Sequence, residues 1–200
     1  MDVADAQREV RQVFRGGFMG QLVSGMIWLA SAAAATWGTP RLAMLILVCG
    51  GFFIFALTML GLRLLGGPWK LSPGNPLNAL GMQVAFVLPL CLPLVGAATL
   101  QKLEWFYPAL MVLMGAHYLP FIFLYGMPMF GVLAAVLVGL GLLMANAARP
   151  AFAVPAWVTG AVLILFAFTG LWLAGRERRR IAGAVGQAHT CGVGGGPSVG

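Results

Sequence analysis

The sequence is poor in charged residues. Only 8% of its 200 residues are Asp, Glu, Lys or Arg, against roughly 25% in an ordinary soluble domain. Hydrophobic residues make up 60% of the chain, and they occur in runs near the length that crosses a bilayer, roughly 17 to 25 residues. The basic residues are dispersed at the ends of these runs and form no stripe typical of a nucleic-acid-binding surface. The composition predicts an all-α protein whose partner is the lipid bilayer and not a nucleic acid.

Acidic residues are scarcer still, with five in the whole chain and none inside an apolar run. Proton relays and cation pumps commonly use intramembrane carboxylates, and metal-dependent membrane proteases need a cluster such as HExxH. His117 is alone among the apolar runs, so it cannot supply both axial ligands of a bis-histidine haem, and no GxSxG elbow occurs. We therefore expect no enzyme activity and no cofactor.

Cysteine is also rare, with three residues that show no disulfide pattern and no CxxC pair. Cys49 and Cys91 lie inside apolar runs. Cys191 stands near His189 at the C-terminal end, but a structural zinc site usually takes four ligands. We expect no metal site.

The chain does contain six apolar runs, separated by segments rich in proline, glycine or charge. They predict a polytopic bundle of six transmembrane helices within a domain over residues 16–176. The expected spans are about 17–37, 42–62, 77–100, 106–125, 129–146 and 156–175. Only Gly126, Met127 and Pro128 separate the fourth run from the fifth, so these two helices must be antiparallel neighbours.

The two ends of the chain have their own patterns. Residues 1–15 place apolar side chains at helical spacing with arginines elsewhere, which predicts a short amphipathic helix on the membrane surface. Residues 177–200 are rich in glycine and predict a disordered tail. A competing interpretation makes residues 1–35 a cleaved signal peptide, because the alanines after Ser31 resemble a cleavage site. The first apolar run is longer than the roughly 7 to 15 residues of a signal-peptide core, which favours a retained span.

The basic residues are distributed unevenly between the two sides of a six-span topology. Nine of the twelve fall on the side of both termini, and Arg41, Lys102 and Arg149 fall on the other. Because Lys and Arg concentrate in cytoplasmic loops, we expect both termini in the cytoplasm, with the protein in the inner membrane of a bacterium.

Small residues four positions apart predict where helices approach closely, because lipid gives helices no hydrophobic reason to associate. Such patterns occur on three of the expected spans: Gly16, Gly20 and Ser24; Gly131, Ala135 and Gly139; Ala156 and Gly160. They fit contacts inside one bundle, and they also fit the seam of a homo-oligomer.

Polar side chains inside the spans gather by depth in the half nearer the cytoplasm. A candidate pocket there comprises His117, Gln83, Gln21, Asn78 and Tyr118. Intramembrane polar residues mark substrate paths, but they also bond neighbouring helices to each other. Pro89, Pro93 and Pro120 free helix carbonyls at similar depth, which fits either interrupted transporter helices or simple kinks.

Six short segments show a family resemblance. They are GQLVSGMIWLAS from Gly20, GNPLN from Gly74, MQVAF from Met82, LPLVGAAT from Leu92, WFYP from Trp105 and GAHYLPF from Gly115. With these segments, residues of about 14–145 resemble a family of small bacterial membrane proteins known only as a domain of unknown function. The resemblance implies a multi-span fold and brings no substrate, cofactor or catalytic residue.

These patterns favour a small transport or permeation protein with a polar pocket in the cytoplasmic half and an unknown small-molecule substrate. The alternative is a non-catalytic membrane scaffold or stress-related protein that acts through helix contacts. A membrane enzyme acting on lipid or quinone has no motif in its favour.

Overall fold

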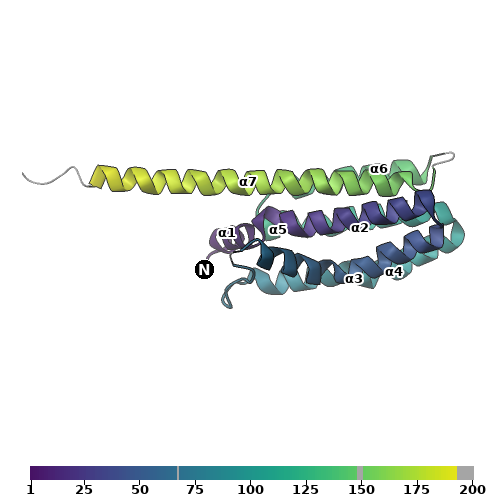
Figure 1. Cartoon of the computed structure of the whole chain (residues 1–200). Coiled ribbons are helices and arrows are strands. Elements are labelled where there is room, and N and C mark those ends of the chain that lie inside the picture. The colour runs from purple at the N-terminus through teal and green to yellow at the C-terminus, as the bar shows by residue number, and fades with distance from the viewer. Residues whose placement is uncertain (67, 148–150, 193–200) are drawn as a thin grey trace, which may run out of the picture.

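The structure, a computed structural model, describes residues 1–66, 68–147 and 151–192, with side chains up to residue 180. All regular structure in this part is helical, which confirms the predicted all-α class (Figure 1). The helices are α1 (Val3–Val13), α2 (Phe18–Trp37), α3 (Pro40–Leu64), α4 (Leu77–Gln101), α5 (Phe106–Tyr125), α6 (Met129–Ala145) and α7 (Val154–Gly192). The 3₁₀ turns η1 (Arg15–Gly17) and η2 (Leu103–Trp105) precede α2 and α5.

In the described part of the chain, five helices are long and apolar enough to cross a membrane, namely α2, α3, α4, α5 and α7. The sixth expected span corresponds to α6, an apolar helix of 17 residues. At 1.5 Å per residue α6 is about 26 Å long, slightly less than the roughly 30 Å hydrocarbon core. The fold is thus a helical membrane bundle in which α6 is the shortest member.

The bundle consists of two groups of three helices. In the first, which we call the α2 half, α2 packs against α3 and α7; in the second, the α5 half, α5 packs against α4 and α6. Each central helix is therefore flanked by two others, and α2 and α5 are the most buried of the candidate spans. The backbones of α3 and α4 stay apart, which leaves the bundle open between them.

Different side chains hold the halves together internally and to each other. Within the α2 half, Gly25 and Gly160 let α2 and α7 approach so closely that a Cβ on either glycine would lie 3.1 Å from the carbonyl oxygen of the other. Between the halves the contact is made by large buried side chains, including Trp28 of α2 and Tyr107 and Met111 of α5. Small residues therefore allow the close contact between α2 and α7. The contact between the two halves depends on how large side chains fit together.

Helix α1 closes one end of the bundle. Asp2 caps it by accepting a hydrogen bond from the Asp5 amide. Ala6 and Val10 on its apolar face are fully buried in the common core. The predicted amphipathic helix is present, but its apolar face is covered by the bundle end and not by the membrane surface.

Both ends of the described chain lie on the same side of the bundle, which we call the α1 end; the opposite side is the distal end (Figure 1). Helix α7 reaches the α1 end and continues to Gly192, whereas a disordered tail was expected from residue 177. The reason is that Ala, Arg, Glu and Gln, which favour helix, outnumber glycine over this stretch. The last eight residues of the expected tail, and the side chains of His189 and Cys191, lie outside the described residues.

Candidate functional site

The interface between the two halves is sealed near the distal end by a buried pair of hydroxyl groups. Ser31 of α2 and Tyr107 of α5 are fully buried, and their oxygens are 2.6 Å apart. Ser31 also donates to the Ala43 carbonyl at 2.8 Å, so its single proton is used there and Tyr107 is the donor between the two hydroxyls. The rings of Trp28 and Phe152 pack against Tyr107, at 5.9 and 4.9 Å between centroids. Aromatic bulk and satisfied hydrogen bonds therefore close this end.

Toward the α1 end, the polar groups of the bundle lack partners. Gln21 and Ser24 of α2 and Thr58 of α3 are 3%, 4% and 9% exposed. Among the described residues, neither amide atom of Gln21 has a hydrogen-bond partner. The hydroxyls of Ser24 and Thr58 and Nδ1 of His117 have none there either. A buried unsatisfied group costs about 1–3 kcal/mol. Such a cluster in a native interior therefore calls for an explanation.

These unpartnered groups lie in the half of the bundle nearer the α1 end. At 1.5 Å per residue, Gln21 and Ser24 lie roughly 5 and 9 Å along α2 from its α1-end start, and His117 of α5 lies roughly 12 Å from the corresponding end of its helix. On α2, Gln21, Ser24, Trp28 and Ser31 fall on the buried side of the helix. Trp28 and Ser31 contact α5, so this polar stripe follows the interface between the halves.

An aromatic cluster lies beside the α1-end part of the stripe. The ring of His117 is 5.8 Å from that of Tyr118 and 5.1 Å from that of Phe121. Phe130 of α6 stacks on Tyr118 at 6.1 Å. A Cβ placed on Gly17 would lie 3.0 Å from Cζ of Phe130 and 3.6 Å from Nε2 of Gln21. Phe130 and the Gln21 amide therefore both lie beside Gly17, so the amide is close to the aromatic cluster.

The structure separates the five residues of the predicted pocket. Gln21 and Tyr118 are buried, and His117 is partly buried. Asn78 and Gln83 of α4 are exposed on the outside of the bundle. Asn78 and Gln83 lie at a depth comparable to that of the other three residues. They are on the exposed face of α4, however, so they do not join the interior cluster.

Helix α1 is tied to the α1 end by Arg11. Its guanidinium donates to both carboxylate oxygens of Glu177 on α7, each at 2.7 Å, and to the Tyr125 carbonyl at 2.6 Å. Gln7 donates to the Phe123 carbonyl. The last carbonyls of a helix lack intrahelical partners, so α1 satisfies the C-terminal end of α5 and joins it to α7.

Glu9 ties α1 to the loop between α3 and α4. Its carboxylate accepts from the Ser72 amide at 2.6 Å, from the Ser72 hydroxyl at 2.9 Å and from the Asn75 side chain at 2.9 Å. The hydrogen bond from Asn75 and the one from the Ser72 amide hold the pKa of Glu9 below its ordinary value. Asn75 in turn caps α4 by accepting from the Leu77 amide. The start of α4 therefore depends on the position of α1.

Two further arginines complete this closure. Arg15 donates to the carbonyls of Leu65 and Gly66 at 3.0 and 2.8 Å. Arg178 of α7 donates to the Gln12 carbonyl at 3.0 Å. Through these contacts α1 and η1 reach the α1-end segments of α3, α4, α5 and α7. The sequence identified these charges only as markers of orientation, because their partners lie far away along the chain.

The predicted small-residue patterns differ in whether their residues lie at close helix contacts. A Cβ on Gly16, which has a φ of 67°, would collide with the Gly170 carbonyl oxygen, whereas one on Gly20 would meet Thr58 at ordinary distance. Ser24, of the same pattern, is buried in the interface. On α6, a Cβ on Gly131 would lie 3.1 Å from the Ile122 side chain, Ala135 is exposed, and a Cβ on Gly139 would meet no described atom within 4 Å.

The closest approach of α5 and α6 uses other glycines. A Cβ on Gly115 would lie 2.9 Å from the Ala134 carbonyl oxygen, and one on Gly141 would lie 3.0 Å from the Pro108 carbonyl oxygen. The helical face that carries Ala134 and Gly141 therefore turns inward, and the neighbouring face that carries Ala135 and Gly139 turns outward. Spacing alone does not distinguish these two faces.

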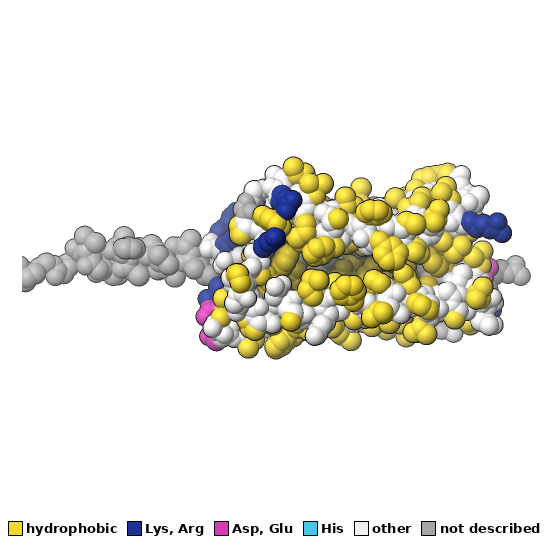
Figure 2. Space-filling model, turned by 90° about the horizontal axis from the view of Figure 1, so that it is seen from below, with side chains coloured by type: hydrophobic (Ala, Val, Ile, Leu, Met, Phe, Trp, Pro, Cys, Tyr) yellow, Lys and Arg dark blue, Asp and Glu magenta, His cyan; other side chains and the backbone are white. Residues whose placement is uncertain are grey.

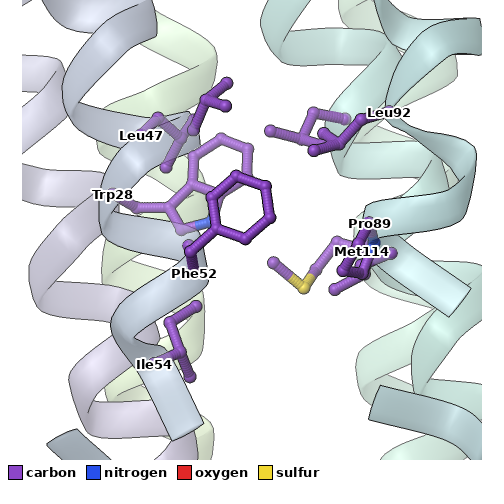
Figure 3. Close-up of a pocket in the computed structure, with 11 residues that line it drawn as sticks. Trp28, Leu47, Phe52, Ile54, Pro89, Leu92 and Met114 are labelled. Carbon is purple, nitrogen blue, oxygen red and sulfur yellow. The ribbon is translucent and has the colours of Figure 1, made fainter. Parts of the chain in front are cut away.

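An apolar groove opens between α3 and α4, where the two backbones stay apart. Its cavity volume is about 80 Å³. Trp28 and Met114 form the floor, Phe52 projects from α3, and Pro89 and Leu92 project from α4 (Figure 3). Figure 2 shows this face of the molecule hollowed along its middle, with hydrophobic side chains on both sides and Lys or Arg at the ends. We call it the α3–α4 groove; its open side faces outward from the bundle.

Comparison with protein families gives a match over residues 3–173 to a family of unknown function, DUF7010. The chain belongs to this family. The match includes α1 and α7 up to Leu173, so it covers the closed α1 end of this DUF7010 member except for Glu177 and Arg178 of α7. It confirms the resemblance to a domain of unknown function over a longer stretch. No curated protein and no solved structure matches the chain significantly.

Proposed function

We propose that this membrane protein is a small transport or permeation protein without enzyme activity, in which a small uncharged polar solute passes between the α2 half and the α5 half. One observation supports this function above the others: Gln21 is 3% exposed in the interface and both of its amide atoms lack partners. An amide offers donors and an acceptor, and a bound solute with hydroxyl or amide groups would satisfy them.

The charge pattern limits the class of solute. The six spans expected from the sequence contain no carboxylate, and an ion at membrane depth needs a compensating charge or a dense set of dipoles. The interior groups near the interface are an amide, hydroxyls and an imidazole. They match a neutral hydrogen-bonding solute.

The path is closed at both ends in this conformation. Ser31 and Tyr107 close the distal end, and α1 covers the α1 end through Arg11 and Glu9. The halves meet mainly through side chains and not through closely packed backbones. A rigid-body movement of one half against the other would open the interface at either end.

Solute flux into proteoliposomes tests the proposal. We expect Gln21→Leu to abolish flux of small neutral polar solutes while the protein still folds, because Leu removes the unsatisfied amide. Gln83→Leu is the matched control, since this amide is exposed on the outside of α4, and it should leave flux unchanged. Wild-type flux equal to that of empty liposomes, across a panel of such solutes, would refute the proposal.

The second candidate function is a scaffold that acts through helix contacts. The outward face of α6 supports it, because Ala135 is exposed and a Cβ on Gly139 would meet no atom of the described residues within 4 Å. Such a face is available to a second copy. Size measurements in detergent for wild type and Gly139→Leu test this candidate: a dimer that dissociates in the variant supports the scaffold, and a monomeric wild type argues against it.

For orientation, we propose that the α1 end faces the cytoplasm of a bacterium, with the protein in its inner membrane. Nine of the twelve basic residues belong to segments at the α1 end, which fits the positive-inside rule. Reporters fused to the two termini should both give a cytoplasmic signal, and a periplasmic signal from either would overturn this topology.

A further inference from the structure

The α3–α4 groove has a different chemistry from the polar interface. Its lining side chains are apolar, including the rings of Trp28 and Phe52, and its open side lies within the membrane-spanning part of α3 and α4 (Figure 3). Water gains no hydrogen-bond partners in such a space. A hydrocarbon chain from the surrounding lipid fills it with favourable contacts.

A cluster of cations stands at the α1 end of the same face. Arg63 and Lys70 lie on the ring of Trp69, at 3.9 and 4.3 Å from its centroid. Among the described residues neither cation forms an ion pair with a carboxylate. Glu9 touches the same loop, but its carboxylate is bonded to Ser72 and Asn75. The cations are therefore free to meet an anion.

Helix geometry aligns this cluster with the groove. Arg63 follows Phe52 by eleven residues, so it lies on nearly the same face of α3, about 16 Å nearer the α1 end. On α4, Asn78 precedes Pro89 by eleven residues, so it too lies on nearly the same face and about 16 Å nearer the α1 end. Gly81, which lies between them, is open, because a Cβ there would meet no atom within 4 Å. Met82 lies seven residues before Pro89, on nearly the same face of α4, and its flexible side chain is 49% exposed, so it borders the path from the groove to the polar end.

We propose that the α3–α4 groove binds an anionic phospholipid, with the acyl chain against Trp28 and Met114 and the phosphate held by Arg63 and Lys70. The distance of about 16 Å between Phe52 and Arg63 along the helix is comparable to half of the roughly 30 Å hydrocarbon core. A lipid whose headgroup lies at the surface therefore places its chain at the depth of the groove. Basic pockets at the ends of membrane helices bind anionic headgroups in this way.

Quenching of tryptophan fluorescence by brominated acyl chains tests the site in the full-length protein. The probes are phosphatidylglycerol and phosphatidylcholine with the same brominated chains, and the Trp28 component is the difference between wild type and Trp28→Phe. We expect phosphatidylglycerol to quench Trp28 at a lower mole fraction than phosphatidylcholine does. Each basic residue should contribute roughly fivefold to this preference.

Variants separate a specific site from ordinary contact with bulk lipid. Arg63→Gln combined with Lys70→Gln should remove the preference for phosphatidylglycerol. Arg41→Gln should keep it, because Arg41 precedes Phe52 by eleven residues and occupies the distal end of the same face. Gly51→Phe should reduce quenching by both lipids, because Gly51 lines the groove and a side chain there projects into open space.

Phosphatidylglycerol retained in native mass spectrometry gives a second measurement that does not depend on Trp28 variants. Equal quenching by the two lipids, or a preference that survives the double variant, would show only nonspecific lipid contact and would overturn the proposal. Retention of phosphatidylglycerol by wild type and its loss in the double variant would support it.

Discussion

Arg11 of α1 and Glu177 of α7 are 166 residues apart in the sequence and form two parallel hydrogen bonds of 2.7 Å. Bidentate pairs between guanidinium and carboxylate are stronger and more directional than single contacts. The Arg11 side chain is 14% exposed and that of Glu177 is 35% exposed, so solvent screens the pair only in part. Because Arg11 also donates to the Tyr125 carbonyl, one side chain joins α1 to both halves of the bundle.

The first prediction concerns this ion pair. Arg11→Gln should lower the free energy of unfolding by about 1–2 kcal/mol, because it removes charged hydrogen bonds to a partly buried partner. Exchange of the two charges, Arg11→Glu with Glu177→Arg, should recover part of this loss. Arg8→Gln is the control, since Arg8 pairs with Asp5 at an exposed site and should change stability by less than about 0.5 kcal/mol. Thermal unfolding in detergent measures all three, and equal effects for Arg11 and Arg8 would contradict the prediction.

The second prediction concerns pH and Glu9. Its pKa is lower in the folded protein than its ordinary value of 4.5, so its contribution is fully present above pH 4.5 and is lost as pH falls through the folded pKa. Hydrogen exchange at residues 68–76 should accelerate in that acid range. Glu9→Gln should show the faster exchange already at neutral pH. Glu104→Gln, on the distal side, should behave as wild type, and a loop indifferent to both pH and Glu9→Gln would refute this account.

The third prediction compares two glycines that the sequence alone cannot distinguish. A Cβ on Gly25 would lie 2.8 Å from Ile164 and 3.1 Å from the Gly160 carbonyl oxygen, whereas one on Gly139 would meet nothing. Gly25→Leu should therefore separate α2 from α7 and lower the melting temperature strongly, or prevent folding. Gly25→Ala should have a smaller effect of the same sign, and Gly139→Leu should leave the melting temperature of a monomer unchanged. Similar melting curves for Gly25→Leu and Gly139→Leu would mean that α2 and α7 do not cross closely.

The fourth prediction concerns His117. Its Nδ1 is buried and has no hydrogen-bond partner among the described residues. Replacing His117 with Leu therefore breaks no hydrogen bond at this atom, and the free energy of unfolding should stay the same or rise by up to about 1 kcal/mol. Under the proposed function the same variant should reduce solute flux, while His117→Gln should retain part of it, because glutamine keeps hydrogen-bonding capacity. Flux and thermal unfolding are measured on the same preparations. A strong loss of stability in His117→Leu would instead show that the imidazole bonds neighbouring helices.

The sequence was sufficient to predict the positions of the helices, because hydropathy and the placement of proline and glycine report directly on span boundaries. The expected depth of the polar groups follows from the same residue count along each helix. The sequence could not predict which face of a helix turns inward. Gln21 and Gln83 have the same side chain at comparable depth, but one lies in the interface and the other on the outside.

The closure by α1 could not be predicted for a different reason. Its arginines and Glu9 look in the sequence like surface charges of a short amphipathic helix. Their partners are backbone carbonyls and side chains that come together only after all helices have packed, as the Arg11–Glu177 pair illustrates. Local patterns report on local structure, and such partners are set by the fold as a whole.

The position of Glu177 has a consequence for the order of assembly. Chains are synthesised from the N-terminus, so Arg11 is made well before Glu177. The ion pair can form only after α7 has been synthesised. Helix α1 can dock fully only when α7 has been inserted. In a chain that stops before α7, Arg11 has no Glu177 to bind, and α1 lacks its contact with α7. Complete docking of α1 therefore depends on α7, the helix farthest from it along the described chain.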